Sequence, residues 1–95
     1  MTGRQTPDFA IPAHVYFREV DGQMVLLNLE NEEYYGLDAV GTDIVKRLTD
    51  RSKAAALDAL LVDYEVDPAV LRRDVDDLIL KLVNAGLLAP REVSP

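Results

Sequence analysis

Several residue types that carry chemistry are missing or rare in this sequence. It contains no cysteine, which excludes disulfides and thiolate metal sites, and its single histidine, His14, excludes a histidine cluster. No apolar run approaches the roughly 18 residues that a membrane-spanning helix needs. The N-terminus, MTGRQTPDFA, has no apolar signal core, so we expect a cytoplasmic protein without a membrane partner.

Positively charged residues are also in the minority. Ten Lys and Arg stand against seventeen Asp and Glu, which gives a formal net charge of −7 at pH 7. Such a balance repels phosphate backbones, and it favours either a basic partner or simple solubility. Taken alone, the charge points first to solubility.

Length and composition are those of one small domain. The chain has 95 residues, of which 48% are hydrophobic, and it shows no repeat and no linker. Residues 1–12 mix Thr, Gly, Pro and Gln and predict a flexible tail, ordered only near Phe9 and Ile11. We expect the domain to span residues 13–89 and residues 90–95 to form a second tail.

The first half of the domain has the alternation and the turn residues of an antiparallel sheet. Residues 14–20 carry β-branched and aromatic side chains at alternate places and predict a strand. Asp21-Gly22 predicts a type I′ hairpin turn, because that turn needs positive φ angles. The returning strand, residues 23–29, should be central, and the turn at residues 30–32 leads to a third strand at residues 33–37.

The third strand should lie at the edge of this sheet, because no further strand is predicted to cover it. Val25, Leu27 and Leu29 share one face of the central strand, and we expect that face to meet the core. An inward Tyr35 would leave Tyr34 pointing outward, and which tyrosine meets the core stays open. An exposed edge can also pair with a second copy, so homodimerisation is one alternative.

The second half of the domain has a helical period. Asp38 can cap a first helix and Ser52 a second. Asp67 followed by Pro68 is the clearest start signal, and Gly86 can end the third helix in a left-handed conformation. The residues expected to point inward from the first two helices are Val40, Ile44, Val45, Leu48, Leu57, Leu60, Leu61 and Tyr64.

Three strands followed by three helices predict an α+β fold of the winged helix-turn-helix type. That group is best known for DNA binding, which makes a nucleic-acid-binding regulator the alternative function. A recognition helix should be basic, because phosphate neutralisation supplies much of the affinity for nucleic acid. The predicted third helix is neutral to acidic, which disfavours this alternative. Its charged residues are Asp67, Asp74, Asp76 and Asp77 against Arg72, Arg73 and Lys81.

The third helix, predicted at residues 68–86, divides into three stripes by its 3.6-residue period. One stripe should be core, one should face water, and the third is half charged and half apolar. A mixed stripe beside a core stripe is typical of a groove wall, although a wide apolar face alone is the more common explanation. In that order, the stripes are Leu71, Val75, Leu78 and Leu82; Val70, Asp74, Asp77 and Lys81; and Arg72, Asp76, Ile79 and Val83.

Nothing in the sequence predicts catalysis or a cofactor. It has no second histidine and no cysteine for a catalytic pair, and its five glycines are scattered rather than gathered in a phosphate loop. The acidic turn with Glu30, Glu32 and Glu33 could be interpreted as a metal cluster, but charged residues at an edge usually block aggregation. We therefore expect a non-catalytic protein without a metal.

Two stretches of the sequence together resemble the PqqD-like family, the recognition domains of ribosomally made peptide natural products. They are VLLNLENEEYYGLDAVGTDIVKRL (25–48) and VDPAVLRRDVDDLILKLVNAGLL (66–88), and the resemblance covers roughly residues 13–89. Within the family, the sequence is most similar to the stand-alone recognition proteins of lasso-peptide pathways. Its end, GLLAP, lacks the tryptophan expected near the C-terminus of the pyrroloquinoline quinone carrier.

The resemblance implies a ligand, a binding mode and two pathway partners. The ligand would be the leader peptide of a precursor, added as an antiparallel strand beside residues 33–37 in the cleft toward the third helix. Lasso leaders typically carry a Tyr-x-x-Pro-x-Leu motif. A separate cysteine-protease-like leader peptidase and an ATP-dependent, asparagine-synthetase-like cyclase would be the partners. The implied peptide-binding residues are Glu32, Glu33, Tyr34, Tyr35, Gly36, Leu37, Arg72, Asp76, Ile79 and Val83.

Overall fold

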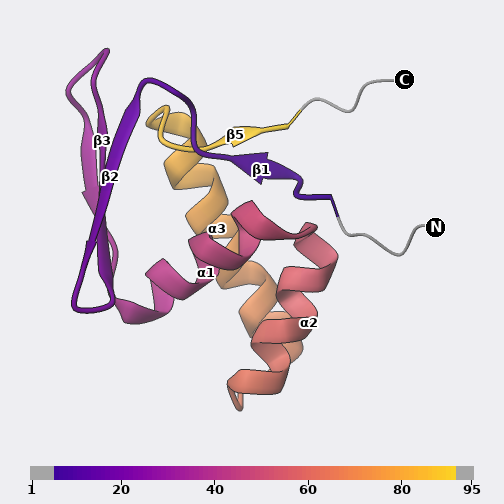
Figure 1. The fold of residues 1–95 in the computed structure, drawn as a ribbon. Coiled ribbons are helices and arrows are strands. Elements are labelled where there is room, and N and C mark those ends of the chain that lie inside the picture. Colours follow the sequence, from indigo (N-terminus) through magenta and orange to yellow (C-terminus); the bar gives the residue numbers. More distant parts are fainter. Residues whose placement is uncertain (1–5, 92–95) are drawn as a thin grey trace.

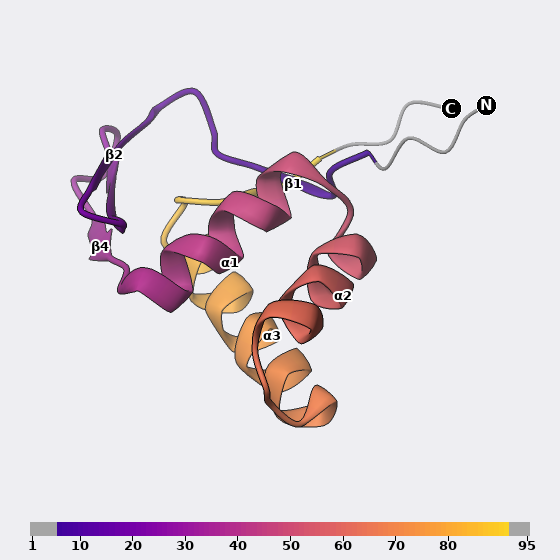
Figure 2. The ribbon, with the colours of Figure 1, turned by 60° about the horizontal axis from the view of Figure 1, so that its bottom comes forward.

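The computed structural model describes residues 6–91 of the chain. It has the predicted α+β fold, in which a three-stranded antiparallel sheet is followed by three helices. The sheet stands to one side of the helices, and β4 leads directly into α1 (Figures 1 and 2). The strands of this sheet are β2 (Val15–Val20), β3 (Gln23–Asn28) and β4 (Tyr34–Gly36), with β3 in the centre.

The turns between the strands have the expected local chemistry. Asp21 and Gly22 adopt φ angles of 55° and 78°, which places Val20 opposite Gln23 in a two-residue hairpin. In the second turn, Glu32 has a φ of 63° and its N–H donates to the carbonyl of Asn28 at 2.8 Å. Both turns confirm where the sequence placed the chain reversals.

Each helix begins at the capping residue that the sequence predicted. The carboxylate of Asp38 accepts the Gly41 N–H at 2.8 Å, and the hydroxyl of Ser52 accepts the Ala55 N–H at 3.1 Å. Asp67 caps the third helix, with Pro68 at its first position. The helices are α1 (Ala39–Asp50), α2 (Lys53–Asp63) and α3 (Pro68–Asn84), and Gly86 follows α3 with a φ of 72°.

A second, two-stranded ribbon joins segments that the sequence assigned mainly to tails. β1 (Phe9–Ala10) pairs antiparallel with β5 (Ala89–Pro90) and lies against α1 (Figure 1). Order near Phe9 and Ile11 was expected, and both side chains pack against the core. Pairing of this segment with residues 89–90 was not expected, because it depends on contacts far apart in the sequence. Residues 1–5 and 92–95 of the two predicted tails lie outside the described residues.

The core has two adjoining parts. The first lies between the inner face of the sheet and the helices, and it contains Val15, Met24, Leu26, Leu37, Val45, Leu82, Leu87 and Leu88. The second lies among the three helices, and it contains Ile44, Leu48, Ala56, Leu60, Leu71 and Val75. Phe9, Leu78 and Ile79 pack against both parts. Three of the four residues predicted as the core stripe of α3 are fully buried, and Leu78 is half-buried.

The predicted inward face of β3 is wrong. Met24, Leu26 and Asn28 point into the core, whereas Val25 and Leu29 remain 49% and 62% exposed. The stretch is apolar on both faces, so alternation alone could not choose between them. Asn28 lies on the buried face, where its amide has hydrogen-bond partners at the end of α3 that the sequence did not show.

Candidate functional site

The outer side of β4 is a free sheet edge, since no strand pairs there among the described residues. Just past β4, the N–H of Leu37 donates to the carbonyl of Met24 at 2.7 Å. Bonded and unbonded positions alternate along an antiparallel ladder, so Tyr34 and Gly36 turn their N–H and C=O groups away from β3. Two donors and two acceptors therefore face outward along this edge.

Gly36 leaves the free edge open to another backbone. A Cβ atom built on Gly36 would meet no atom within 4 Å, so packing within this chain does not require the glycine. The absence of a side chain instead leaves space for a close approach from outside. A glycine in this position is well suited to an edge that pairs with an added strand.

A hollow of about 360 Å³ lies beside this edge. Three elements form it: the end of β4 with the residues that follow, the first turns of α1, and one residue of α3. Its walls are mostly apolar, and its one carboxylate, Asp38, is engaged in capping α1. The lining residues are Tyr35, Gly36, Leu37, Asp38, Val40, Gly41, Ile44 and Leu78.

Two residues that were predicted for the core also line this hollow. Val40 was expected to point inward from α1, but its side chain is 47% exposed. Leu78 is half-buried, so part of its surface is still available beside the free edge. The helical period was clear from the sequence, but the sequence did not show which apolar side chains remain exposed to solvent.

The structure resolves the two adjacent tyrosines. Tyr35 lies opposite the buried Leu26, packs against the core and lines the hollow. Tyr34 lies on the other face of the sheet and is 74% exposed. Leu37 is buried at the base of the hollow. Glu32 and Glu33 are exposed where the turn enters β4, at the start of the free edge.

The mixed stripe of α3, by contrast, lies on a different side of the helix. Asp76 forms an ion pair with Lys53 of α2 at 2.6 Å, and Arg72 lines a hollow formed by α2 and α3. Ile79 and Val83 are half-buried and pack against the core. The hollow beside β4 instead takes Leu78 from α3. Arg72 and Asp76 lie toward α2 and are not among the lining residues of this hollow, and their contact with a peptide stays a prediction.

Asn28 ties the turn before β4 to the end of α3. Its amide nitrogen donates to the carbonyls of Ala85 and Gly86, both at 3.2 Å. Its amide oxygen accepts the N–H of Glu30 at 2.9 Å. His14 adds a bond of 3.2 Å between its Nε2 and the same Gly86 carbonyl. A buried amide with this many partners holds the β3–β4 turn against the helix layer.

A carboxylate network supports α1 from the side of α2. Arg47 and the hydroxyl of Tyr64 donate to the two oxygens of Asp43, at 2.7 and 2.9 Å. Partial burial alone would raise the pKa of Asp43, but these hydrogen bonds outweigh it and lower that pKa below its ordinary value. Arg47 also donates to Asp63 at the end of α2. The network joins the middle of α1 to the C-terminal end of α2.

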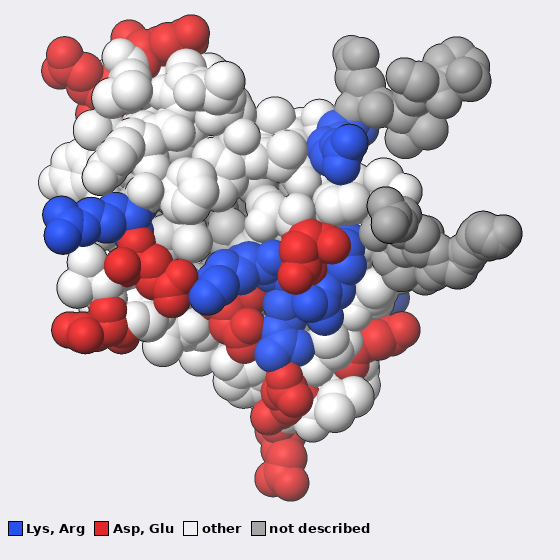
Figure 3. All heavy atoms as spheres, in the orientation of Figure 1, with Lys and Arg blue, Asp and Glu red and all other residues white. Residues whose placement is uncertain are grey.

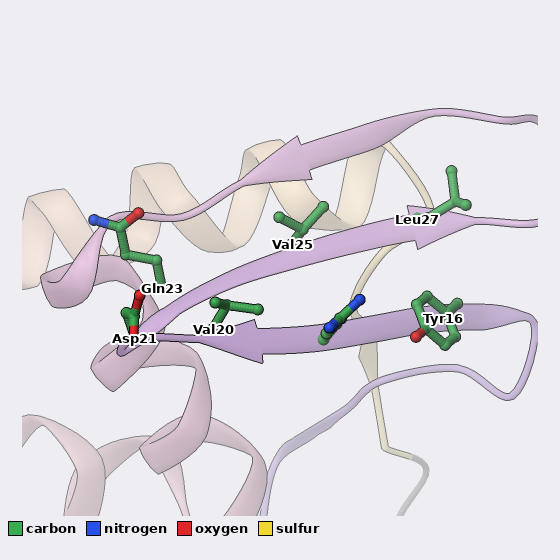
Figure 4. A pocket seen from close by; sticks show the side chains of 7 residues that line it. Tyr16, Val20, Asp21, Gln23, Val25 and Leu27 are labelled. Atoms are coloured by element: carbon green, nitrogen blue, oxygen red, sulfur yellow. The ribbon is translucent and has the colours of Figure 1, made fainter.

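The outer face of the sheet is a second exposed apolar surface. Figure 4 shows Tyr16, Val20, Val25 and Leu27 on one side of β2 and β3. They line a shallow hollow of about 500 Å³ together with Arg18 and, at the hairpin tip, Asp21 and Gln23. This surface is the face that the sequence expected to be buried.

The described residues form neither a metal site nor a membrane-spanning helix. No group of three or more His, Asp or Glu side chains among residues 6–91 is placed to hold a metal ion. None of the described helices is both long and apolar enough to cross a membrane. On the face shown in Figure 3, Lys and Arg gather in a band across the helices, with acidic side chains between them and beyond.

A family model described as coenzyme PQQ synthesis protein D, PqqD, matches residues 23–88. The chain belongs to the PqqD family. This assignment confirms the resemblance seen in the sequence. The match includes β3, β4 and all three helices of the PqqD-family chain, and so it covers the free edge and the hollow beside it. No curated protein matches the chain.

Two solved structures have the same fold as this PqqD-family chain. One is described as TbiB1 in complex with the TbiA(beta) leader peptide, and it is 33% identical with a TM-score of 0.79. That match covers 88% of this chain and 99% of the other. The second is lasso peptide synthetase B1 complexed with the leader peptide, 31% identical, with a TM-score of 0.78 and coverage of 87% and 99%.

Proposed function

We propose that this chain is a non-catalytic adaptor that binds the leader peptide of a ribosomally made precursor, of the lasso type, at the free edge of β4. The observation that carries the proposal is an open sheet edge beside an apolar hollow. The two similar solved structures are both complexes with a leader peptide, which supports the same ligand class here.

The leader would bind as a fourth strand of the sheet. Its main chain would pair with the outward N–H and C=O groups of Tyr34 and Gly36, which tolerate many sequences. Specificity would come from side chains entering the hollow between Tyr35, Val40 and Leu78. Each large apolar side chain buried there would contribute about 1.5–3 kcal/mol before ordering costs. Acidic residues at the entry to β4 would attract lysines of the leader.

The proposal includes two protein partners, a cysteine-protease-like leader peptidase and an asparagine-synthetase-like cyclase, in the cytoplasm. A peptide on the edge of β4 leaves the outer face of the sheet uncovered. That face exposes Tyr16, Val20 and Val25, and exposed apolar patches of this kind mark protein interaction sites. The adaptor could thus hold a leader and contact a partner through different surfaces.

The direct test is titration of the fluorescein-labelled TbiA(beta) leader with the full chain, followed by fluorescence anisotropy. We expect saturable binding of one peptide per chain, with a Kd in the micromolar range or below, which corresponds to about −8 kcal/mol. A labelled DNA duplex in the same low-salt buffer serves as the second ligand. We expect no binding of the duplex by an acidic chain.

Two outcomes would contradict the proposal. One is absence of binding both for the TbiA(beta) leader and for the leader encoded beside this chain's own gene. The other is tight, steeply salt-dependent binding of the duplex, which would favour the nucleic-acid alternative.

A further inference from the structure

Another hollow lies next to the hollow beside β4, along α1, and we call it the second hollow. It has a volume of about 200 Å³ and lies between the start of α1, the connection from α2 to α3, and the first turns of α3. Val40 and Ile44 line both hollows, so the two hollows lie next to each other at the start of α1. The lining residues of the second hollow are Val40, Ile44, Leu60, Tyr64, Val66, Val70, Leu71 and Asp74.

The walls of the second hollow are apolar and partly exposed. Val40, Val66 and Val70 are all exposed although they surround one concave surface. The ring of Tyr64 forms another part of the wall, and its hydroxyl is held by Asp43 at 2.9 Å. The hollow is therefore shaped for the apolar body of one long side chain.

Asp74 is the only charged residue in this lining. No ion pair or hydrogen bond of its side chain occurs within residues 6–91, whereas Asp43 and Asp63 nearby in the fold are both held by Arg47. The connection beside the hollow adds Glu65 and Asp67, and no basic residue lies among its lining residues. The mouth of an apolar hollow is thus negatively charged.

We propose that the second hollow binds a lysine or arginine side chain of the leader peptide; this inference rests on the proposed function. The methylene stem would lie along Val66 and Val70, and the cation would meet the carboxylate of Asp74. Long basic side chains bury an apolar stem while keeping the charged end at the surface. A purely apolar side chain would remove water from Asp74 without replacing its interactions.

The direction of the strands places this residue within the leader. β4 runs from Tyr34 to Gly36 and leads through Asp38 into α1, where the second hollow lies. A leader paired antiparallel to β4 runs the opposite way. Its N-terminal part therefore extends over α1, and the basic residue precedes the segment that pairs with the sheet.

The experiment uses two sets of synthetic TbiA(beta) leader peptides. In one set each position in turn is replaced by lysine, and in the other by norleucine, which has a stem of similar length without the charge. We expect one position, N-terminal to the paired segment, at which lysine binds about three- to fivefold more tightly than norleucine. Asp74→Asn should remove this preference. Asp77→Asn, one turn on and outside the hollow, should leave it unchanged.

A second variant tests the hollow itself. Val70→Trp places a large ring in the hollow at an exposed position, so the chain should still fold, and the preference for lysine should disappear. The inference is overturned if no position prefers lysine, or if the preference survives both Asp74→Asn and Val70→Trp. A peptide that binds wild type without any such preference leaves the proposed function intact, whereas absence of all peptide binding counts against the proposed function.

Discussion

The sheet has two open edges, and they differ in what lies beside them. The Leu29 N–H donates to the His14 carbonyl at 2.9 Å, so along β2 the groups of Phe17 and Glu19 turn outward, as those of Tyr34 and Gly36 do along β4. Both edges therefore offer backbone partners to an added strand. Among the described residues, the edge of β4 borders a hollow lined by α1 and α3, whereas the hollow lined by β2 lies on the outer face of the sheet.

The edge of β2 has features that discourage pairing. Arg18 and Glu19 place charges on both of its faces, and Glu19 forms an ion pair with Lys46 at 3.1 Å. Charged side chains on an edge strand are a common defence against unwanted pairing. On the proposed function, the comparison means that free backbone groups alone do not make a peptide site. A pocket beside them supplies the affinity that depends on side chains.

The largest effect on peptide binding should come from proline at the edge of β4, with proline at the edge of β2 as the control. Gly36→Pro removes an outward N–H and places a ring where the added strand would lie, so binding of the TbiA(beta) leader should weaken by about 30- to 100-fold. Phe17→Pro removes the equivalent outward N–H of β2, and an edge strand tolerates proline at such a position. Binding should therefore change less than about twofold. Anisotropy titrations measure both, with thermal unfolding as a check on folding. The reverse pattern would assign the peptide to β2.

The turn that leads into β4 also depends on an anchor at the end of α3. Gly86 has a φ of +72°, and a Cβ atom there would lie 2.5 Å from the amide nitrogen of Asn28. Gly86→Ala should lower the free energy of unfolding by about 2–3 kcal/mol, through strain and the displaced amide. Gly22→Ala has a similar φ but open space, so it should cost only about 1 kcal/mol. Equal urea midpoints for the two variants would show that Asn28 adapts without cost.

Removing the pocket should make the β4 edge resemble the β2 edge. Leu78→Ala deletes most of the α3 wall, so binding of the TbiA(beta) leader should weaken by about tenfold. Asp76→Ala changes the flank that faces α2, and we expect less than about a twofold effect. Anisotropy titrations compare the two variants. A larger loss of leader affinity for Asp76→Ala than for Leu78→Ala would instead support the groove that the sequence predicted, with Asp76 in its wall.

The parts predicted correctly from the sequence depend on local interactions. Asp38, Ser52 and Asp67 mark the start of each helix because a capping side chain bonds within its own first turn. Asp21-Gly22 marks the hairpin because few other residues adopt its φ angles easily. The edge position of β4 followed from the order of these elements.

The parts missed depend on contacts between distant segments. The inward face of β3 was misjudged because Asn28 finds its partners at Ala85 and Gly86, more than fifty residues away. The contact of Asp76 with Lys53 of α2 was not predicted, because the helical period gives the stripes of α3 but not the elements that lie beside them. Two signals were available: an apolar run on both faces of β3, and Val40 at the start of α1, both of which indicate surface meant for contact.

The smallest effect should come from the ion pairs behind the two edges, and it should depend on pH. The pKa of Asp43 is lowered in the folded chain, so its contribution to stability is present above the unfolded pKa of about 3.9 and is lost as pH falls through the lower folded value. Asp43→Asn should therefore lower the free energy of unfolding by less than about 1 kcal/mol at pH 6, and by still less at pH 3. Glu19→Gln, at the more exposed pair beside β2, should have no measurable effect at either pH. Urea unfolding at the two pH values gives the four comparisons. A loss for Asp43→Asn that is larger at pH 3 than at pH 6 would show that the carboxylate stabilises the folded chain in its protonated form, as a hydrogen-bonding group rather than an anion.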